Sequence, residues 1–161
     1  MQTFLPSPDF AECARVLDGK RLNKQITEVK QILMAITGES DGWRNHPAVA
    51  MWRGHYDALI EYGVALYDEW QSRLDLGKRG GKRTHKSGEW ITACWLNFHA
   101  WRGNRKQKYY SVPWLTPDVC SAYRALLLAK DPEWYGQFGW SEEPNADSKR
   151  IFEMIKEEMK R

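Results

Sequence analysis

Apolar residues recur at helical spacing along most of this chain. Between residues 17 and 37 the predicted buried face consists of Leu22, Ile26, Val29, Leu33 and Ile36, which fall on one side of an α-helix. The same spacing predicts further helices over residues 7–17, 46–76, 90–98, 116–130 and 148–160. No alternating pattern of useful length is present. The sequence therefore predicts an all-α fold, a compact single domain over residues 1–161.

Proline, glycine and short polar residues predict where these helices begin and end. Ser7–Pro8 and Thr116–Pro117 are typical of helix starts, and Gly38 is typical of a helix end. Gly63 lies on the apolar face of the 46–76 helix, where a missing side chain would let another helix approach closely. The stretches predicted as irregular are the glycine-rich basic segment 77–88, the basic segment 102–111 and the aromatic segment 134–140.

One flank of the 17–37 helix is polar and carries a single carboxylate. Glu28 shares this flank with the cations and amides Arg21, Lys24, Gln25 and Gln31. In one interpretation, Glu28 is a solvated residue that pairs with Lys24 one turn earlier. In the other, an isolated anion among cations serves proton transfer beside a polyanion.

A free N-terminal amine within reach of Glu28 would support the second interpretation. An α-amine has a pKa of about 7.7–8.0, against about 10.4 for a lysine side chain, so more of it is a neutral nucleophile near neutral pH. Such an amine can attack C1′ of a sugar, displace the base and leave an imine, from which strand cleavage by elimination can follow. The carboxylate would move protons and stabilise positive charge that develops on the sugar.

Positive charge is modest in total but uneven along the chain. The formal net charge is +3, while acidic residues gather at 142–143 and in the last predicted helix. This asymmetry favours an anionic partner on one side of the protein, although solvated lysine-rich loops would give the same pattern. Some of the nine tryptophans must be core, and the others are left for stacking on bases. The two basic runs are Lys78, Arg79, Lys82, Arg83 and Lys86, and Arg102, Arg105, Lys106 and Lys108.

Two short segments combine residue types that suit DNA. Residues 42–47, Gly-Trp-Arg-Asn-His-Pro, place an aromatic ring, a guanidinium and an amide at a helix start, where a phosphate is favoured. Alternatively, Asn45 or His46 caps the helix and Trp43 packs against it. Trp134 and Tyr135 offer rings for stacking on an exposed base, or else close over the core.

Cysteine spacing and hydropathy indicate the setting of the protein. Cys13, Cys94 and Cys120 are odd in number and far apart, which fits buried thiols in a reducing compartment. No standard zinc pattern is present, so we expect no metal and no other cofactor. The chain has no apolar run of membrane-spanning length and no signal-peptide pattern. We therefore expect a cytoplasmic protein that does not act on membranes.

Three longer strings share order and character with one known family. Residues 17–28 read Leu-Asp-Gly-Lys-Arg-Leu-Asn-Lys-Gln-Ile-Thr-Glu, residues 45–52 read Asn-His-Pro-Ala-Val-Ala-Met-Trp, and residues 127–140 end in Trp-Tyr-Gly-Gln-Phe-Gly-Trp. In this order they resemble the pyrimidine-dimer DNA glycosylases of the phage endonuclease V type, and Glu28 falls on the position of that family's catalytic glutamate. The resemblance implies a compact helical fold, no metal, a flipped nucleotide and imine chemistry through the N-terminal amine.

The start of the chain departs from the family pattern. The phage enzyme exposes a threonine amine after loss of its initiator methionine. Here residue 2 is Gln2, and methionine removal normally requires a small second residue. Met1 would therefore keep the amine, unless unusual processing exposes Thr3.

We predict a monomeric DNA glycosylase, with an associated AP-lyase activity, that excises damaged pyrimidines such as cyclobutane dimers from double-stranded DNA. Two alternatives remain open: a glycosylase for another modified or hypermodified base, and a non-catalytic DNA-binding module. The predicted catalytic residues are Glu28, Met1 and Arg21. The predicted DNA contacts are Lys24, Gln25, Arg44, Asn45, His46, Arg53, Arg79, Arg83, Lys86, Arg124, Trp134 and Tyr135.

Overall fold

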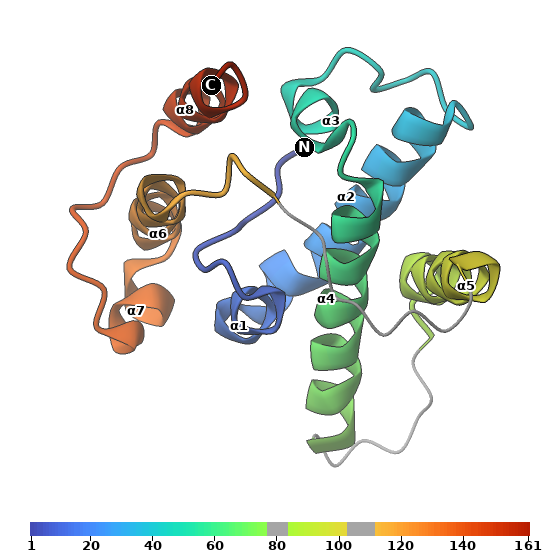
Figure 1. Cartoon of the computed structure of the whole chain (residues 1–161). Coiled ribbons are helices and arrows are strands. Elements are labelled where there is room, and N and C mark those ends of the chain that lie inside the picture. The colour runs from blue at the N-terminus through green and yellow to red at the C-terminus, as the bar shows by residue number, and fades with distance from the viewer. Residues whose placement is uncertain (77–83, 103–111) are drawn as a thin grey trace.

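The computed structural model describes residues 1–76, 84–102 and 112–161. In these residues it contains eight α-helices, one short 3-10 helix and no strand, so the predicted all-α fold is confirmed (Figure 1). Within the same ranges no helix is both long and apolar enough to cross a membrane. The predicted DNA contacts Arg79 and Arg83 lie outside the described residues. The elements are α1 (Phe10–Val16), α2 (Gly19–Thr37), α3 (Pro47–Trp52), α4 (Tyr56–Leu76), α5 (Lys86–Arg102), α6 (Pro117–Lys130), α7 (Pro132–Tyr135), η1 (Gly136–Phe138) and α8 (Ser148–Glu158).

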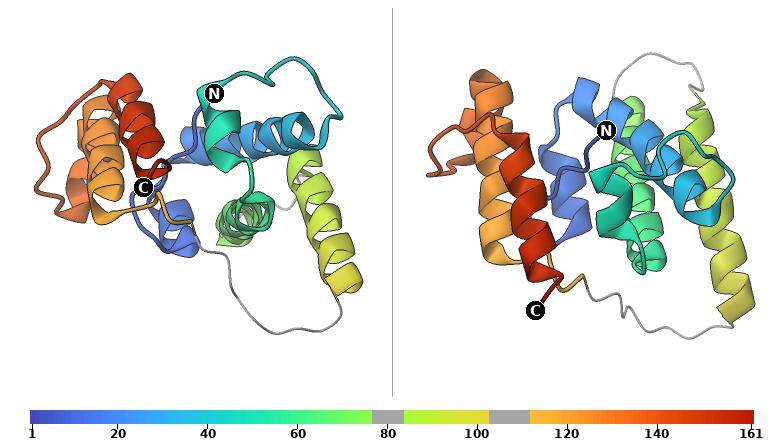
Figure 2. Two further views of the ribbon diagram at one scale, coloured as in Figure 1. Left: turned by 45° about the horizontal axis from the view of Figure 1, so that its top comes forward. Right: turned by 90° about the horizontal axis from the view of Figure 1, so that it is seen from above.

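Helix α4 is the central helix of the fold. It packs against α1, α2 and α5, while α2 also packs against α3 and α5. The C-terminal elements form a second group, in which α6 contacts α7 and α8, and α8 contacts α3. In Figure 1 and in both views of Figure 2 the N-terminus lies between α3 and the C-terminal helices. The first residues of the chain therefore run between two groups of helices.

The helix that carries Glu28 begins and ends where its sequence predicts. Asp18 caps its N-terminus by accepting hydrogen bonds of 3.0 Å from the backbone N–H groups of Lys20 and Arg21. Gly38 ends the helix with a φ of 82°, in the left-handed region that favours glycine. The apolar face of α2 is buried against α3, α4 and α5. This packing fixes the flank on which Glu28 lies.

Helix α1 begins later than the sequence predicts. Its N-cap is Asp9, whose carboxylate accepts hydrogen bonds from the N–H groups of Ala11 and Glu12. The predicted cap, Ser7, instead donates its hydroxyl proton to the Glu12 carboxylate. The N-cap of α1 is therefore Asp9, two residues after the Ser7 that the Ser-Pro pair predicts.

The single helix predicted over residues 46–76 is wrong, because the structure has two helices there. Helix α3 ends at Trp52 and α4 begins at Tyr56. Between them Gly54 adopts a φ of 82°, which breaks the helical backbone. The hydrophobic period continues across the break because both helices turn apolar residues toward the same core.

Gly63 allows three helices to meet closely, as predicted. A Cβ atom at this position of α4 would lie 2.8 Å from Cγ1 of Val29 on α2 and 3.0 Å from Cγ2 of Ile91 on α5. Both distances are shorter than side-chain atoms normally allow. The close contact holds α2 against the central helix.

Residues 134–138 of the aromatic segment 134–140 are helical, where the sequence predicts a loop. Asp131 caps α7 by accepting a hydrogen bond of 3.1 Å from the N–H of Trp134, and η1 follows directly. The ring of Tyr135 stacks on Trp140 with centroids 5.8 Å apart, and Phe138 lies beside Trp140 at 5.4 Å. Proline at the first helical position and the Asp131 cap start this turn of helix.

Candidate active site

A pocket of about 420 Å³ lies where the N-terminal segment passes α2. Residues of α2, α6 and α8, together with the N-cap of α3, form its wall. It brings together six of the predicted site residues: Met1, Arg21, Lys24, Gln25, Glu28 and His46. The rest of the lining is Gln2, Phe4, Lys20, Lys130, Ser148 and Phe152.

The N-terminal amine and the Glu28 carboxylate face each other in this pocket. The nitrogen of Met1 lies 3.9 Å from Oε1 of Glu28. The Met1 side chain is only 2% exposed although the residue as a whole is partly exposed, so most of its accessible surface belongs to the main chain. The Glu28 side chain is 9% exposed. A nucleophile and a proton acceptor are thus held side by side.

The two oxygens of Glu28 have different partners. Oε1 faces cations, with the Met1 amine at 3.9 Å and Nζ of Lys24 at 3.7 Å. Oε2 accepts hydrogen bonds from Nε2 of Gln25 at 2.7 Å and from the backbone N–H of Gln2 at 3.4 Å. The carboxylate is therefore held along one edge and presents the other edge to the amine.

Gln25 is fully buried, which contradicts its predicted contact with DNA. Its amide nitrogen donates to the Gln2 carbonyl at 2.6 Å and to Glu28 at 2.7 Å. Its amide oxygen accepts from the backbone N–H of Phe4 and from the hydroxyl of Tyr62, both at 3.1 Å. Two donors and two acceptor positions exhaust what an amide side chain offers, so none remains for DNA.

Further buried contacts hold the N-terminal segment. Thr3 is fully buried, and its hydroxyl oxygen accepts a hydrogen bond of 3.2 Å from Nε1 of Trp52. The hydroxyl of Tyr62 donates to the carbonyl of Phe4 at 2.9 Å. An amine exposed at Thr3 by processing would begin inside the core, whereas Met1 begins in the pocket.

His46 lies in the pocket wall and caps α3. Its Nδ1 accepts a hydrogen bond of 3.1 Å from the N–H of Ala48, so the neutral ring carries its proton on Nε2. Burial and the nearby positive amine of Met1 lower the pKa of His46, and the negative charge of Glu28 only partly opposes them. Its ring meets Phe152 of α8 edge to face, with centroids 6.3 Å apart. His46 therefore adds a neutral ring, rather than a cation, to the pocket.

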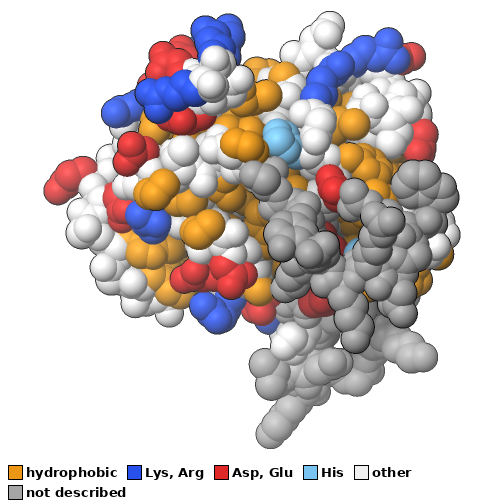
Figure 3. Space-filling view, viewed as in Figure 1, with side chains coloured by type: hydrophobic (Ala, Val, Ile, Leu, Met, Phe, Trp, Pro, Cys, Tyr) orange, Lys and Arg blue, Asp and Glu red, His pale blue; other side chains and the backbone are white. Residues whose placement is uncertain are grey.

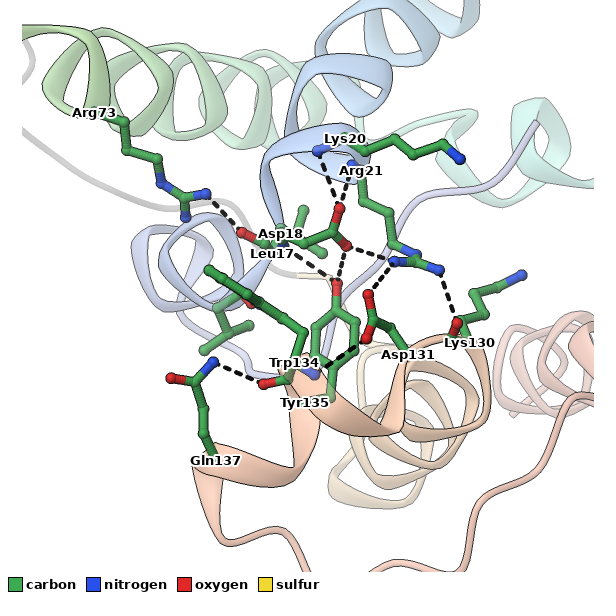
Figure 4. Close-up of polar contacts among 11 residues, drawn as sticks. Leu17, Asp18, Lys20, Arg21, Arg73, Lys130, Asp131, Trp134, Tyr135 and Gln137 are labelled. Carbon is green, nitrogen blue, oxygen red and sulfur yellow. Dashed lines mark hydrogen bonds and ion pairs between the residues drawn. The ribbon is translucent and has the colours of Figure 1, made fainter. Parts of the chain in front are cut away.

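Arg21 joins α2 to the C-terminal helices, as Figure 4 shows. Its Nη1 pairs with Oδ2 of Asp18 at 2.6 Å and with Asp131 at 3.6 Å, and its Nη2 donates to the Lys130 carbonyl at 3.3 Å. The guanidinium also lies 5.6 Å from the ring centroid of Tyr135. Its hydrogen bonds are directed within the protein, so Arg21 supports the pocket wall.

Three lysines leave their ammonium groups at the edge of the pocket. Lys20, Lys24 and Lys130 are all exposed and all line it. The Lys24 side chain is 71% exposed even though its Nζ is within 3.7 Å of Glu28. Exposed ammonium groups around a small pocket favour the phosphates of a nucleic acid backbone.

Asp18 ties α7 to the start of α2, and this link predicts a loss of stability in acid. Burial alone would raise the pKa of Asp18, but hydrogen bonds from Arg21 and Tyr135 outweigh it and lower the pKa. A depressed folded pKa means that the stabilisation is complete above the unfolded pKa and is lost as pH falls below about 4. Asp18→Asn keeps the cap but loses the charge, so we expect a loss of roughly 1.5–3 kcal/mol near pH 7.

Urea unfolding at pH 7 and pH 3 measures this effect. The difference in the free energy of unfolding between wild type and Asp18→Asn is expected to shrink at pH 3. This pH is below the unfolded pKa of Asp18, so the unfolded chain is protonated there and part of the stabilisation is lost. An equal difference at both pH values would contradict the assignment.

Several predicted DNA contacts lie outside this pocket. Arg44 and Asn45 are exposed in the connection between α2 and α3, where Arg44 pairs with Asp41 at 2.5 Å. Arg53 is exposed and donates to the Arg44 carbonyl at 2.6 Å, and Lys86 is exposed at the start of α5. In the view of Figure 3, Lys and Arg side chains gather along the upper edge, over α8 and over the connection between α2 and α3.

The remaining predicted contacts have partners inside the protein. Tyr135 is fully buried and donates its hydroxyl to Asp18 at 2.8 Å, so its ring is not a stacking platform, contrary to the prediction. Trp134 is 38% exposed, and its Nε1 donates to the carbonyl of Val16 at 2.9 Å. Arg124 pairs with Glu142 at 2.6 Å and donates to the Pro6 carbonyl at 2.8 Å, which ties α6 to the N-terminal segment.

Sequence reasoning missed half of the pocket lining. Lys20 precedes Lys24 by one helical turn, so the spacing that selected Lys24 also pointed to Lys20. Lys130 and Phe152 are more than 100 residues away from Glu28 along the chain, and no local pattern links them to it. Only the packing of α6 and α8 beside the N-terminal segment brings them into the site.

The fold and the pocket define an all-helical protein with an amine–carboxylate pair edged by cations. The family model described as pyrimidine dimer DNA glycosylase matches residues 1–76, which hold α1 to α4, the N-terminal amine and Glu28. The resemblance of the sequence to this family is therefore confirmed over residues 1–76. Members of this family are enzymes that act on damaged DNA. Comparison with curated proteins and with solved structures gave no match.

Proposed function

We propose that this protein is a DNA glycosylase with an associated AP-lyase activity, which removes damaged pyrimidines such as cyclobutane dimers from double-stranded DNA. The observation that carries the proposal is the 3.9 Å separation of the Met1 nitrogen and Oε1 of Glu28 inside a cation-edged pocket. The match of residues 1–76 to the glycosylase family model supports the class of substrate. The protein would act as a monomer and without a cofactor.

The amine begins the reaction. Its lone pair forms a bond to C1′ of the everted nucleotide while the bond from C1′ to the base breaks, and the base leaves with that electron pair and takes up a proton. Glu28 accepts the proton that the nitrogen loses and returns it to the ring oxygen as the sugar opens, which leaves an imine at C1′. Loss of a C2′ proton then expels the 3′ phosphate, and water hydrolyses the imine to release the enzyme.

The pocket wall supplies the contacts for DNA. The ammonium groups of Lys20, Lys24 and Lys130, which line the pocket, would bind backbone phosphates near an everted nucleotide. The neutral rings of His46 and Phe152 offer apolar surface for the nucleotide itself. Asp18 and Asp131 offset the charge of Arg21, so we assign Arg21 to support of the wall rather than to the chemistry.

Borohydride trapping tests the proposal. Reduction of the imine should link the protein covalently to ultraviolet-irradiated duplex DNA, and the same duplex should be cleaved when borohydride is left out. An unirradiated duplex of the same sequence is the control and should give neither product. Absence of an adduct with irradiated DNA would overturn the imine mechanism, whereas an adduct formed only with a duplex that carries another modified base would change the substrate.

A further inference from the structure

The side chain of Gln25 joins both reacting groups of the site. It lies on α2, one helical turn before Glu28, and is fully buried. One hydrogen of its amide nitrogen goes to Oε2 of Glu28 and the other to the carbonyl of Gln2, the residue that follows the reactive amine. At 2.7 and 2.6 Å these are short contacts for N–H···O bonds.

The contacts with the N-terminal segment form a two-point pairing. Gln25 donates to the carbonyl of residue 2 and accepts from the N–H of residue 4. A neighbouring strand would pair with an extended segment through the same two backbone groups. Thr3, between them, turns its side chain away to Trp52. The pairing distinguishes one register of the segment from the next, because a shift by one residue presents the wrong backbone groups to the amide.

We propose that Gln25 is the positioning residue of this active site, whose amide fixes the register of the N-terminal segment so that the amine of residue 1 faces Glu28. The inference rests on the proposed function. Gln25 contacts Oε2 of Glu28, but it bonds to neither the amine nitrogen nor Oε1, the two atoms that face each other. It holds Oε2 of Glu28 and the carbonyl of Gln2 in fixed positions relative to each other. Fixing the geometry of reacting groups in this way raises reaction rates by large factors.

Variants at Gln25 test this role through the rate of adduct formation on DNA with an abasic site, where only the amine chemistry is needed. Gln25→Met replaces the amide by a side chain of similar length and removes all four of its hydrogen bonds. We expect it to slow borohydride trapping on the order of 100-fold, with the dissociation constant for the same DNA little changed. Gln31→Met, at an exposed position of α2, is the matched control and should trap at the wild-type rate.

The pH–rate profile of Gln25→Glu separates a positioning role from a purely structural one, because a purely structural role would leave the profile unchanged. It places a second carboxyl group against Oε2 of Glu28, and two carboxyl groups that share a site raise the pKa of the pair. The acidic limb of the pH–rate profile should therefore move to higher pH. An unmoved limb together with wild-type trapping would overturn the inference.

Lengthening the chain by one residue tests the register without altering the core. A single glycine added before Met1 moves the terminal amine by up to 3.8 Å. With the register fixed, trapping should fall by a similar factor of about 100. If the segment instead slides by one residue, trapping persists near the wild-type rate and the inference is wrong, even where both Gln25 variants fail to fold. Absence of an adduct with the wild-type protein itself would overturn the proposed function instead.

Discussion

Glu28→Gln is expected to abolish turnover while DNA binding persists. The glutamine side chain keeps the size of Glu28 but cannot accept the proton that the amine loses, and it offers no negative charge to a developing sugar cation. Loss of a general acid–base residue costs on the order of 10²–10⁴-fold in rate. Single-turnover cleavage of the C1′–base bond in irradiated duplex DNA, read as abasic sites that alkali converts to strand breaks, measures the loss.

Retained binding together with lost turnover in this variant separates an enzyme from a DNA-binding module. Glu28 lies among Lys20, Lys24 and Lys130, so removal of its negative charge should leave affinity unchanged or raise it. Glu39→Gln, at an exposed position just after α2, is the control and should behave as wild type. A Glu28→Gln protein that breaks the C1′–base bond at the wild-type rate would show that Glu28 holds its neighbours in place and has no part in the chemistry.

The sequence predicted the helix that carries the site because local signals define that helix completely. The Asp18 cap, the Gly38 stop and the apolar face of α2 all lie within 21 residues of chain. The break at Gly54 was missed because a glycine turn does not interrupt the hydrophobic period when both helices pack on one core. Helix caps and hydrophobic periodicity are local properties of the sequence. Whether a glycine interrupts a helix depends on how the flanking segments pack.

Residue types alone could not separate the chemical role of Glu28 from the supporting roles of its neighbours. Gln25 and Lys24 are adjacent on a polar flank and both suit DNA. The structure buries Gln25 beneath the N-terminal segment and leaves Lys24 exposed. Trp134 and Tyr135 are also adjacent residues with different surroundings. The hydroxyl of Tyr135 donates to Asp18 and its ring is buried, whereas Trp134 donates to the Val16 carbonyl and stays partly exposed. The deciding partners are distant in sequence, so the roles emerge only from the fold.

Acetylation of the N-terminal amine is expected to eliminate the covalent adduct entirely. An amide nitrogen has no lone pair free for attack on C1′, so no imine can form. The Met1 nitrogen and Lys24 Nζ lie at 3.9 and 3.7 Å from the same Glu28 oxygen, so geometry alone makes both candidates for the nucleophile. The higher pKa of a lysine side chain, about 10.4 against 7.7–8.0 for an α-amine, favours Met1.

Protein carrying an N-terminal acetyl group, confirmed by the mass of its first peptide, should give no adduct with irradiated or abasic DNA. Lys24→Arg, which keeps a cation beside Glu28 but offers no amine, should still be trapped. The opposite pattern, with an adduct after acetylation and none with Lys24→Arg, would identify Lys24 as the nucleophile. Slow cleavage of the C1′–base bond by the acetylated protein would be consistent with Glu28 activating water in place of the amine, because that carboxylate keeps its hydrogen bond to Gln25.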